Sequence, residues 1–267
     1  MQKLPQIADK SVLAAVQENI KEVSVLKARI KFRKFGVMKF IGHLDVMRFF
    51  QKAMRRAQIP IALSEGYSPH MIMSFAQPLG VGITSDGEYM DVELKAPIAS
   101  DEAVERLNKA MVEGVEVVSF REISDDKKAS GMTIVAAADY KVTLLASSRT
   151  SEVTEDIPDR WIEKTEEFMG LPEIVVMKKT KRSEKEVDIK PMIYKMEACE
   201  DGWHLFLATG SEQNLKPDLV MDAFLKYCGE EPQNVPLHFH RLEVYARQDG
   251  TPSGYVTLES LGKEISL

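Results

Sequence analysis

Residues 28–36 read ARIKFRKFG and alternate apolar and basic side chains. Ile30 and Phe32 occupy one set of alternate positions, and Lys31 and Arg33 occupy the other. Successive side chains of a strand point to opposite faces of a sheet, so this period of two predicts a half-buried β-strand. Residues 43–58, HLDVMRFFQKAMRRAQ, then carry apolar side chains at helical spacing and stop before a proline. The fold therefore begins with a basic strand and an amphipathic helix.

The rest of the chain continues this alternation of strands and helices. Two short β-type runs surround a loop rich in Gly and Pro, and an alternating strand, a helix that begins at Ser100, and another strand follow up to residue 122. The order β-α-β-β-α-β is the ferredoxin-like pattern, here with an elaborated middle hairpin. The pattern recurs after residue 137. The sequence therefore predicts an α+β protein made of two tandem ferredoxin-like (βαββαβ) domains.

The domain boundaries follow from the same runs of residues. We expect a tail with one short strand to be loosely attached after the second domain. The polar segment ISDDKKASGMTIVAA reads as a linker. The predicted parts are a leading helical extension at 1–27, a first domain at 28–122, a linker at 123–137, a second domain at 138–247, and the tail at 248–267.

Composition limits the class of protein. No apolar run approaches the roughly 20 residues that span a bilayer, and the first residues, MQKLPQIADK, lack the apolar stretch of a secretory signal. The two cysteines, Cys199 and Cys228, form no close-spaced motif, which excludes an Fe–S cluster or a Cys-rich zinc site built from this chain alone. We therefore expect a cytoplasmic protein with no membrane association and no cofactor.

Charge is distributed unevenly along the chain. The net charge is −6, yet residues 27–60 hold ten Lys or Arg against the single acid Asp45. On the 43–58 helix the bases fall on the side opposite the apolar stripe, and like charges four residues apart repel one another unless a partner is present. An unmixed basic stripe therefore favours a phosphate partner over a merely solvated face. The predicted RNA contacts are Arg33, Lys34, Arg48, Lys52, Arg55, Arg56, Tyr67, His70, Lys181 and Arg182.

The loop SEGYSPH, residues 64–70, adds a candidate stacking element. Gly66 and Pro69 fix the backbone, while Tyr67 and His70 offer ring faces to unpaired bases. The alternative is an ordinary hairpin turn in which the same Tyr and His are structural. His43 has a similar double reading at the start of the helix, as a residue of the cap region or as a group that contacts phosphate.

Several of these motifs together resemble a known family. The basic first strand, the His43-Leu44-Asp45 helix start, the Arg55-Arg56 pair, the 64–70 loop and SFAQPL at 74–79 are similar to the opening of the bacterial radical-SAM-associated (radical-SAM-linked) proteins, a domain of unknown function. KEVDIKP at 185–191 resembles a second family segment, although Lys190 stands where Arg is expected. The resemblance covers about residues 28–247. It implies a radical-SAM partner protein and a role near RNA processing.

Three function classes remain open at this stage. The first is a non-catalytic RNA-binding companion that presents tRNA or rRNA to a radical-SAM enzyme. The second is a metal-independent RNA-processing enzyme with His43 or His70 as its general base, although neither His has a visible orienting partner in the sequence. The third is a small-molecule pocket between the two domains. A zinc site at His204, His238 and His240 is a further reading, which depends on strand register.

Overall fold

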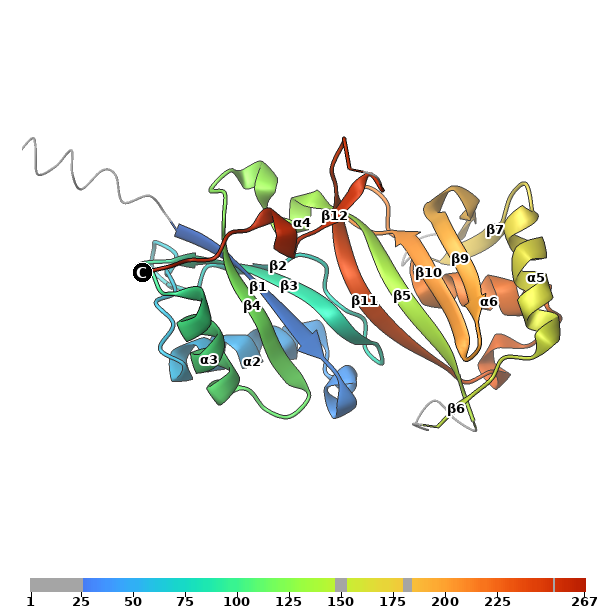
Figure 1. The fold of residues 1–267 in the computed structure, drawn as a ribbon, viewed down its shortest axis with the longest axis horizontal. Helices are drawn as coiled ribbons and strands as arrows, with labels where there is room; N and C mark the ends of the chain where they lie inside the picture. The colour runs from blue at the N-terminus through green and yellow to red at the C-terminus, as the bar shows by residue number, and fades with distance from the viewer. Residues whose placement is uncertain (1–25, 147–152, 180–183, 252) are drawn as a thin grey trace, which may run out of the picture.

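The computed structural model describes residues 26–146, 153–179, 184–251 and 253–267. Nearly all of the predicted leading extension lies outside these residues, as do Lys181 and Arg182. The α+β class is confirmed, because the described part contains five α-helices and a mixed ten-stranded sheet (Figure 1). None of its helices is both long enough and apolar enough to cross a membrane.

The first half of the molecule, residues 26–123, places two helices between its strands. Its strands lie in the order β4-β1-β3, with short β2 beside β3, and all neighbours are antiparallel. The elements are β1 (Leu26–Lys34), α2 (His43–Arg56), β2 (Met73–Phe75), β3 (Thr84–Leu94), α3 (Ser100–Ala110) and β4 (Val115–Ile123), with a 3-10 helix, η1, at Gly36–Phe40.

The second half, residues 135–247, repeats this order of elements. Its strands lie in the order β11-β5-β10-β9, again with antiparallel neighbours. The main elements are β5 (Val135–Leu145), α5 (Asp159–Gly170), β9 (Ile193–Cys199), β10 (Gly202–Ala208), α6 (Pro217–Tyr227) and β11 (Leu237–Arg247). The smaller ones are β6 (Thr154–Glu155), the separate β7–β8 hairpin (Val175–Lys179 and Glu184–Asp188), and the 3-10 helices η3 (Lys190–Met192) and η4 (Pro232–Asn234).

The two halves share one sheet. β3 and β11 pair in parallel at two positions, Thr84 with His240 and Ser85 with Arg241. Gly87 permits the close approach, since a Cβ there would lie 2.7 Å from the Cα of Glu243. The division into tandem ferredoxin-like domains stays a prediction, because the main strands of both halves belong to one ten-stranded sheet.

The predicted linker is more ordered than a polar connector. It contains a 3-10 helix, η2 (Lys127–Ala129), and a short helix, α4 (Gly131–Ile134), and its last residues already belong to β5. Val135 and Ala137 are buried there. The connection between the halves is therefore part of the sheet, because small and apolar side chains at its end fit a buried strand.

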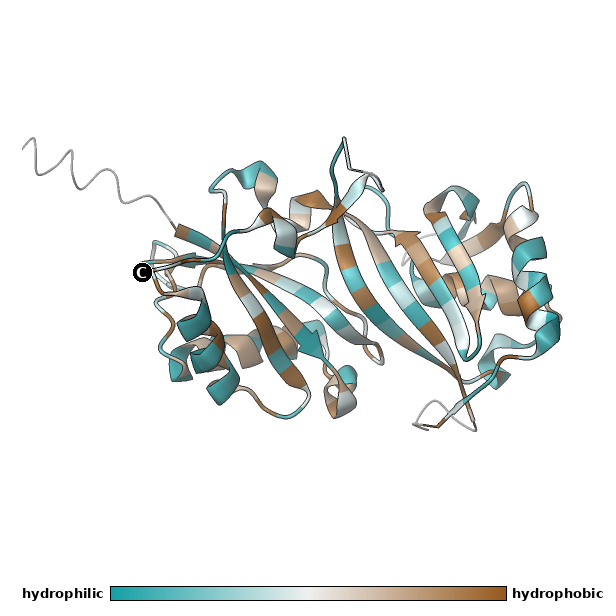
Figure 2. Ribbon diagram, in the orientation of Figure 1, coloured by the Kyte–Doolittle hydropathy of each residue, from teal (hydrophilic) through white to brown (hydrophobic). Residues whose placement is uncertain are grey.

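Apolar side chains form two core clusters, one centred on each half, and the second cluster also includes Ala76 and Tyr89 of the first half. Alternating bands of hydropathy run along the long strands (Figure 2), and the apolar set of β1 packs under α2 and α3. Phe32 and Phe50 meet edge to face with ring centroids 4.7 Å apart. In the second half Trp203 and Phe224 make a similar contact at 5.4 Å. The predicted apolar stripe of α2 is confirmed by the burial of Val46, Phe50, Ala53 and Ala57.

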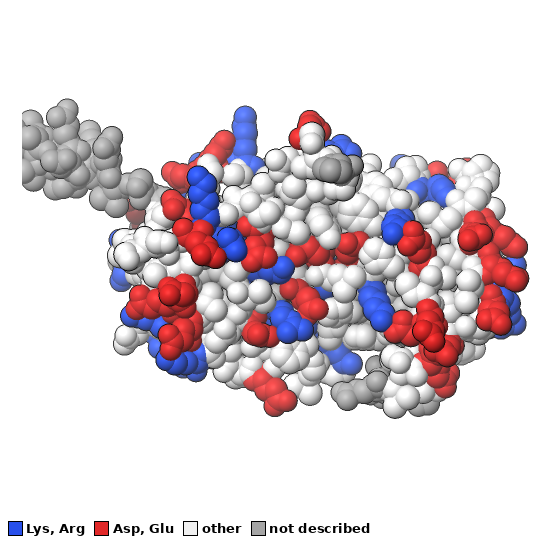
Figure 3. Space-filling model, in the orientation of Figure 1, with Lys and Arg blue, Asp and Glu red and all other residues white. Residues whose placement is uncertain are grey.

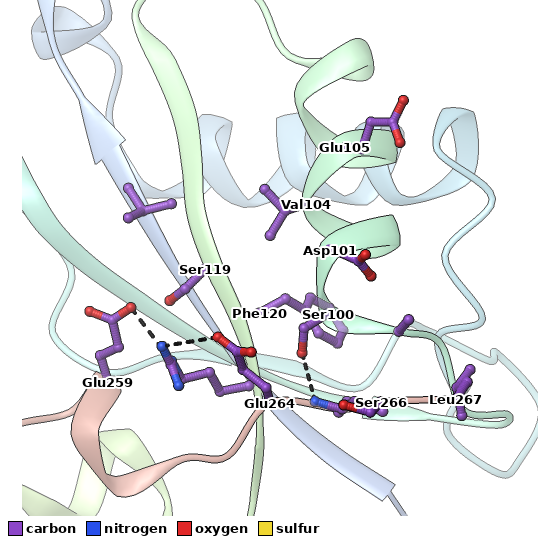
Figure 4. Close-up of a pocket in the computed structure, with 14 residues that line it drawn as sticks. Ser100, Asp101, Val104, Glu105, Ser119, Phe120, Glu259, Glu264, Ser266 and Leu267 are labelled. Carbon is purple, nitrogen blue, oxygen red and sulfur yellow. Dashed lines mark hydrogen bonds and ion pairs between the residues drawn. The ribbon is translucent and has the colours of Figure 1, made fainter.

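The residues after β11 return to the first half, so the expectation of a loosely attached tail was wrong. β12 (Tyr255–Thr257) pairs with β11, and the 3-10 helix η5 (Glu259–Leu261) follows. Residues 258–267, the last part of the tail, cross the strands of the first half (Figure 1). Leu258 is completely buried, and the tail bonds to β4 where Lys263 pairs with Glu122. Ile265 and Ser100 exchange two hydrogen bonds at the start of α3 (Figure 4). These contacts come from residues distant in sequence, which local patterns do not reveal.

Candidate nucleic-acid interface

The exposed face of α2 carries a row of cations. Arg48, Lys52, Arg55 and Arg56 are all exposed, as the helical spacing predicts. Arg48 forms an ion pair with Asp45 at 3.2 Å, and Arg56 donates to the carbonyl oxygen of Ala110 at 2.7 Å. Within the described residues, Lys52 and Arg55 have no acidic partner, since no ion pair there includes either of them. The row can therefore neutralise phosphates without first breaking strong internal contacts.

His43 is the first residue of α2, and its ring packs against the hydrophobic core. Its ring meets the ring of Phe75 edge to face, with centroids 5.0 Å apart. The cap position is Gly42, which has no side chain that could satisfy the first amides of the helix. His43 is therefore half-buried, and its contact with the β2 strand gives it a packing role.

The 64–70 loop is fastened at its base and open at its tip. The backbone of Ser64 donates to the carbonyl oxygen of His70, and the Ser64 hydroxyl lies 2.8 Å from Nδ1 of His70. Leu63 and Met71 form a β-bridge below this contact. Tyr67 is fully exposed at the tip. The structure thus gives His70 a loop-closing contact and leaves the Tyr67 ring free to stack.

A surface hollow of about 490 Å³ lies between this loop and the C-terminal end of α2. Arg55 and Gln58 line it from the helix side, His70 from the loop, and Lys95 from the end of β3. None of the described residues that line it is Asp or Glu. The hollow therefore brings Arg55 and His70 together, whereas His43 lies at the other end of the same helix.

Two predicted RNA contacts on β1 are engaged elsewhere. Arg33 forms ion pairs with Asp86 at 2.7 Å and Glu116 at 3.0 Å. Lys34 is buried and donates to the carbonyl oxygen of Ile41 at 2.9 Å. Burial also lowers the pKa of Lys34. Lys34 is thus not offered to a partner, because its side chain is buried and its ammonium group already has an acceptor.

The uncovered face of the sheet mixes both signs of charge. In Figure 3 acidic and basic side chains are interspersed across the view that shows the tail. Lys31 pairs with Glu243 at 2.7 Å, and Arg29 pairs with Asp91 at the same distance. The hollow along the tail is lined by Arg121 together with four acids, Asp101, Glu105, Glu259 and Glu264 (Figure 4). In the part of the chain that the structure describes, this face therefore offers no unpaired basic surface comparable to α2.

The three histidines considered for zinc do not form one site. His204 and His240 lie on either side of Lys141, which is the register partner of both. His204 contacts Asp139 at 3.0 Å, whereas His238 and His240 both contact the hydroxyl of Thr84. The described residues contain no group of three metal-ligating side chains. Burial, with smaller effects from the charges of Lys39 and His240, lowers the pKa of His238 to about 4.

An aromatic cluster on the second half was missed from the sequence. Tyr194, Phe206, Tyr245 and Tyr255 come from four different strands, and their ring centroids lie 5.0 to 5.9 Å apart. The Tyr245 hydroxyl donates to Asp139 at 2.8 Å. Each of the four strands contributes one ring, and the rings meet because the register of the strands places them side by side. No local signal could have found this cluster.

Comparison with known proteins gives one positive result. Among curated proteins no match to the chain is found. The model of one protein family matches residues 27–217, which is more than half of the chain and includes α2, the 64–70 loop and the hollow. The chain therefore belongs to this family, DUF2344, which is described as an uncharacterized protein conserved in bacteria.

Proposed function

We propose that the protein binds RNA without catalytic activity of its own and acts as the companion of a radical-SAM enzyme, to which it presents tRNA or rRNA. The observation that carries the proposal is the exposed cation row of α2, which leads into a hollow lined by no acid among the described residues, beside the loop that carries Tyr67. Phosphates need cations that are not already neutralised, and unpaired bases stack on exposed rings. The radical-SAM partner rests on the sequence resemblance alone.

The strand order supports the tandem ferredoxin-like arrangement that accompanies this proposal. The four main strands of the second half are β5, β9, β10 and β11. Counted in this way, each half has its first strand between its third and fourth strands, and a helix follows the first and the third. We therefore regard the halves as two ferredoxin-like units fused along β3 and β11.

The geometry gives less support to an RNA-processing enzyme. A general base needs a partner that orients its ring. In the described part of the chain, His43 has a ring contact with Phe75 and His70 has a hydroxyl contact with Ser64, but no hydrogen bond or ion pair joins either ring to a carboxylate. The site holds RNA better than it activates a nucleophile.

RNA affinity measured as a function of salt concentration tests the proposal. Replacing Arg48 and Lys52 by Ala removes two phosphate contacts, so the slope of log affinity against log salt should fall by about 1.5 for a single strand. The matched control replaces Arg160 and Lys164 by Ala, two cations at the same spacing on α5 of the other half. Equal losses in both double variants, or no salt-dependent binding to cellular RNA, would contradict the proposal.

Two further measurements separate the alternatives. A companion leaves the bound RNA intact, so intact RNA should be recovered after incubation with the wild type. Cleavage that disappears in His70→Ala or His43→Ala would establish the enzyme instead. Crosslinking in cells followed by mass spectrometry should recover a radical-SAM protein, and its absence would remove the companion part of the proposal.

A further inference from the structure

The hollow beside α2 combines an apolar floor with a polar rim. Ile59, Ile61 and Met71 are buried below it, and Leu63 is a half-exposed apolar wall. Its volume of about 490 Å³ lies within the range of small-ligand sites. A phosphate alone would leave this apolar surface in contact with water. The floor therefore favours an anionic ligand that also carries a flat apolar group.

The rim supplies charge and directional hydrogen bonds. Arg55 and Lys95 are exposed cations on opposite elements, the end of α2 and the residue after β3. Gln58 offers both an amide donor and an amide acceptor. Nδ1 of His70 is engaged by Ser64, and Nε2 has no hydrogen-bond partner within the described residues. Cations and an amide around an apolar floor suit an anion that carries a heterocycle.

Another cationic hollow, between α2 and α3, provides a contrast. It is lined by Arg56, Arg106 and Lys109, but Arg106 pairs with Glu102 and Lys109 pairs with Glu105 along the same helix. Its cations are therefore largely neutralised, while neither Arg55 nor Lys95 takes part in any ion pair of the described residues. Charge complementarity favours the hollow at Arg55 for an anionic ligand.

We infer that this hollow receives one unpaired nucleotide of the bound RNA. The base lies on the apolar floor with its edge against the Gln58 amide, and Arg55 and Lys95 contact the flanking phosphates. Tyr67, on the loop whose ends line the hollow, stacks the neighbouring base. The inference rests on the proposed function and specifies its substrate class: RNA with an unpaired nucleotide. A base held in a duplex cannot enter, because it must first leave its stack.

The test compares a single-stranded RNA with a duplex of the same sequence by fluorescence anisotropy. Leu63→Glu places a negative charge at the wall of the hollow, and its exposure of 56% lets the fold tolerate the change. The matched control is Val37→Glu on η1, a 74% exposed apolar residue outside the hollow. We expect Leu63→Glu to weaken single-strand binding about tenfold and the control to leave it unchanged.

The outcomes separate this inference from the proposed function. Unchanged single-strand binding by Leu63→Glu, or equal wild-type affinity for duplex and single strand, would overturn the nucleotide site while RNA binding stands. If no RNA binds, titration with 5′-AMP and 5′-UMP decides: NMR shifts confined to the hollow would keep a nucleotide site and reject the RNA function. Absence of both RNA and mononucleotide binding would reject both.

Discussion

At Gln58 the chain adopts a left-handed backbone conformation with φ of 52°, which no other described non-glycine residue shares. The backbone N–H of Gln58 donates to the carbonyl oxygen of Arg55, and the backbone N–H of Ile59 donates to the carbonyl oxygen of Met54. Gln58 therefore ends α2 in the manner of a Schellman motif. Glycine usually occupies this position because it lacks the Cβ that opposes a positive φ. A side chain is therefore retained here at a cost in stability, beside the hollow that it lines.

Replacing Gln58 by Gly should raise the free energy of unfolding by about 0.5–1 kcal/mol. The substitution removes a backbone strain of about 1–2 kcal/mol from the folded state. Part of this gain is offset, because Gly gives the unfolded chain more conformational entropy. Urea unfolding measures the change. The same variant should bind single-stranded RNA more weakly, which is the signature of a strained residue kept for function. A Gly variant that is no more stable would show that the turn imposes no strain.

His238 should make the folded state sensitive to mild acid. Its pKa is about 4 in the folded protein, below its ordinary value of 6.5, because burial and the charges of Lys39 and His240 disfavour the protonated ring. Below pH 6.5 the unfolded chain binds a proton that the folded one does not, so stability is full above that pH and is lost as the pH falls toward 4. Urea unfolding from pH 7.5 to 4 should show His238→Gln with a flatter profile than the wild type. Parallel profiles would exclude His238 as the cause.

Among the elements, α2 was predictable and the tail was not. The spacing of residues along α2 predicted both its buried apolar face and its exposed basic face, because both faces depend only on positions within one segment. The attachment of the tail depends on Ser100 and Glu122, which lie more than a hundred residues away in sequence. The hollow shows the same limit. Its helix and loop were identified from the sequence, but Lys95 joins it through the pairing of residues 61 and 94 and through its own backbone hydrogen bond to Pro60.

Two neighbouring tail residues should differ in their effect on stability. Ile265 is 8% exposed and packs in the core of the first half, whereas Leu267 is 78% exposed. Ile265→Ala should lower the free energy of unfolding by about 2 kcal/mol or more, because it leaves a cavity. Leu267→Ala should change it by less than about 0.5 kcal/mol. Similar values for both in chemical denaturation would show that the tail does not contribute to the core.

On the scale of the whole molecule, buried charges connect the halves. Arg241 on β11 donates to Glu88 on β3 at 2.9 Å, and both side chains are almost fully buried. Tyr89 on β3 donates to Glu243 on β11 at 2.7 Å. No single-segment pattern predicted this junction, because strands from distant parts of the sequence contribute one partner each. These side-chain contacts join β3 and β11 in addition to the two backbone register pairs.

Arg241→Met should therefore destabilise the protein strongly. The substitution leaves the Glu88 carboxylate buried without its partner, at a cost of about 3–5 kcal/mol. Changing Glu88 to Leu in the same chain should recover much of the loss, because both charges are then absent. Arg33→Met at an exposed pair is the control and should cost less than about 1 kcal/mol. A loss at Arg241 no larger than at Arg33 would refute the role of the buried pair.

The return of the tail to the first half has a consequence for biosynthesis. The ion-pair partners of Lys31 and Arg121 are Glu243, Glu259 and Glu264, all of which are translated after the second half has begun to emerge. At a typical elongation rate the interval between residues 123 and 258 lasts on the order of ten seconds. During that interval Lys31 and Arg121 still lack these acidic partners, whereas Arg29 already has its partner Asp91 within the first half. The order of synthesis thus makes the pairing of these two cations one of the last contacts that the first half can form.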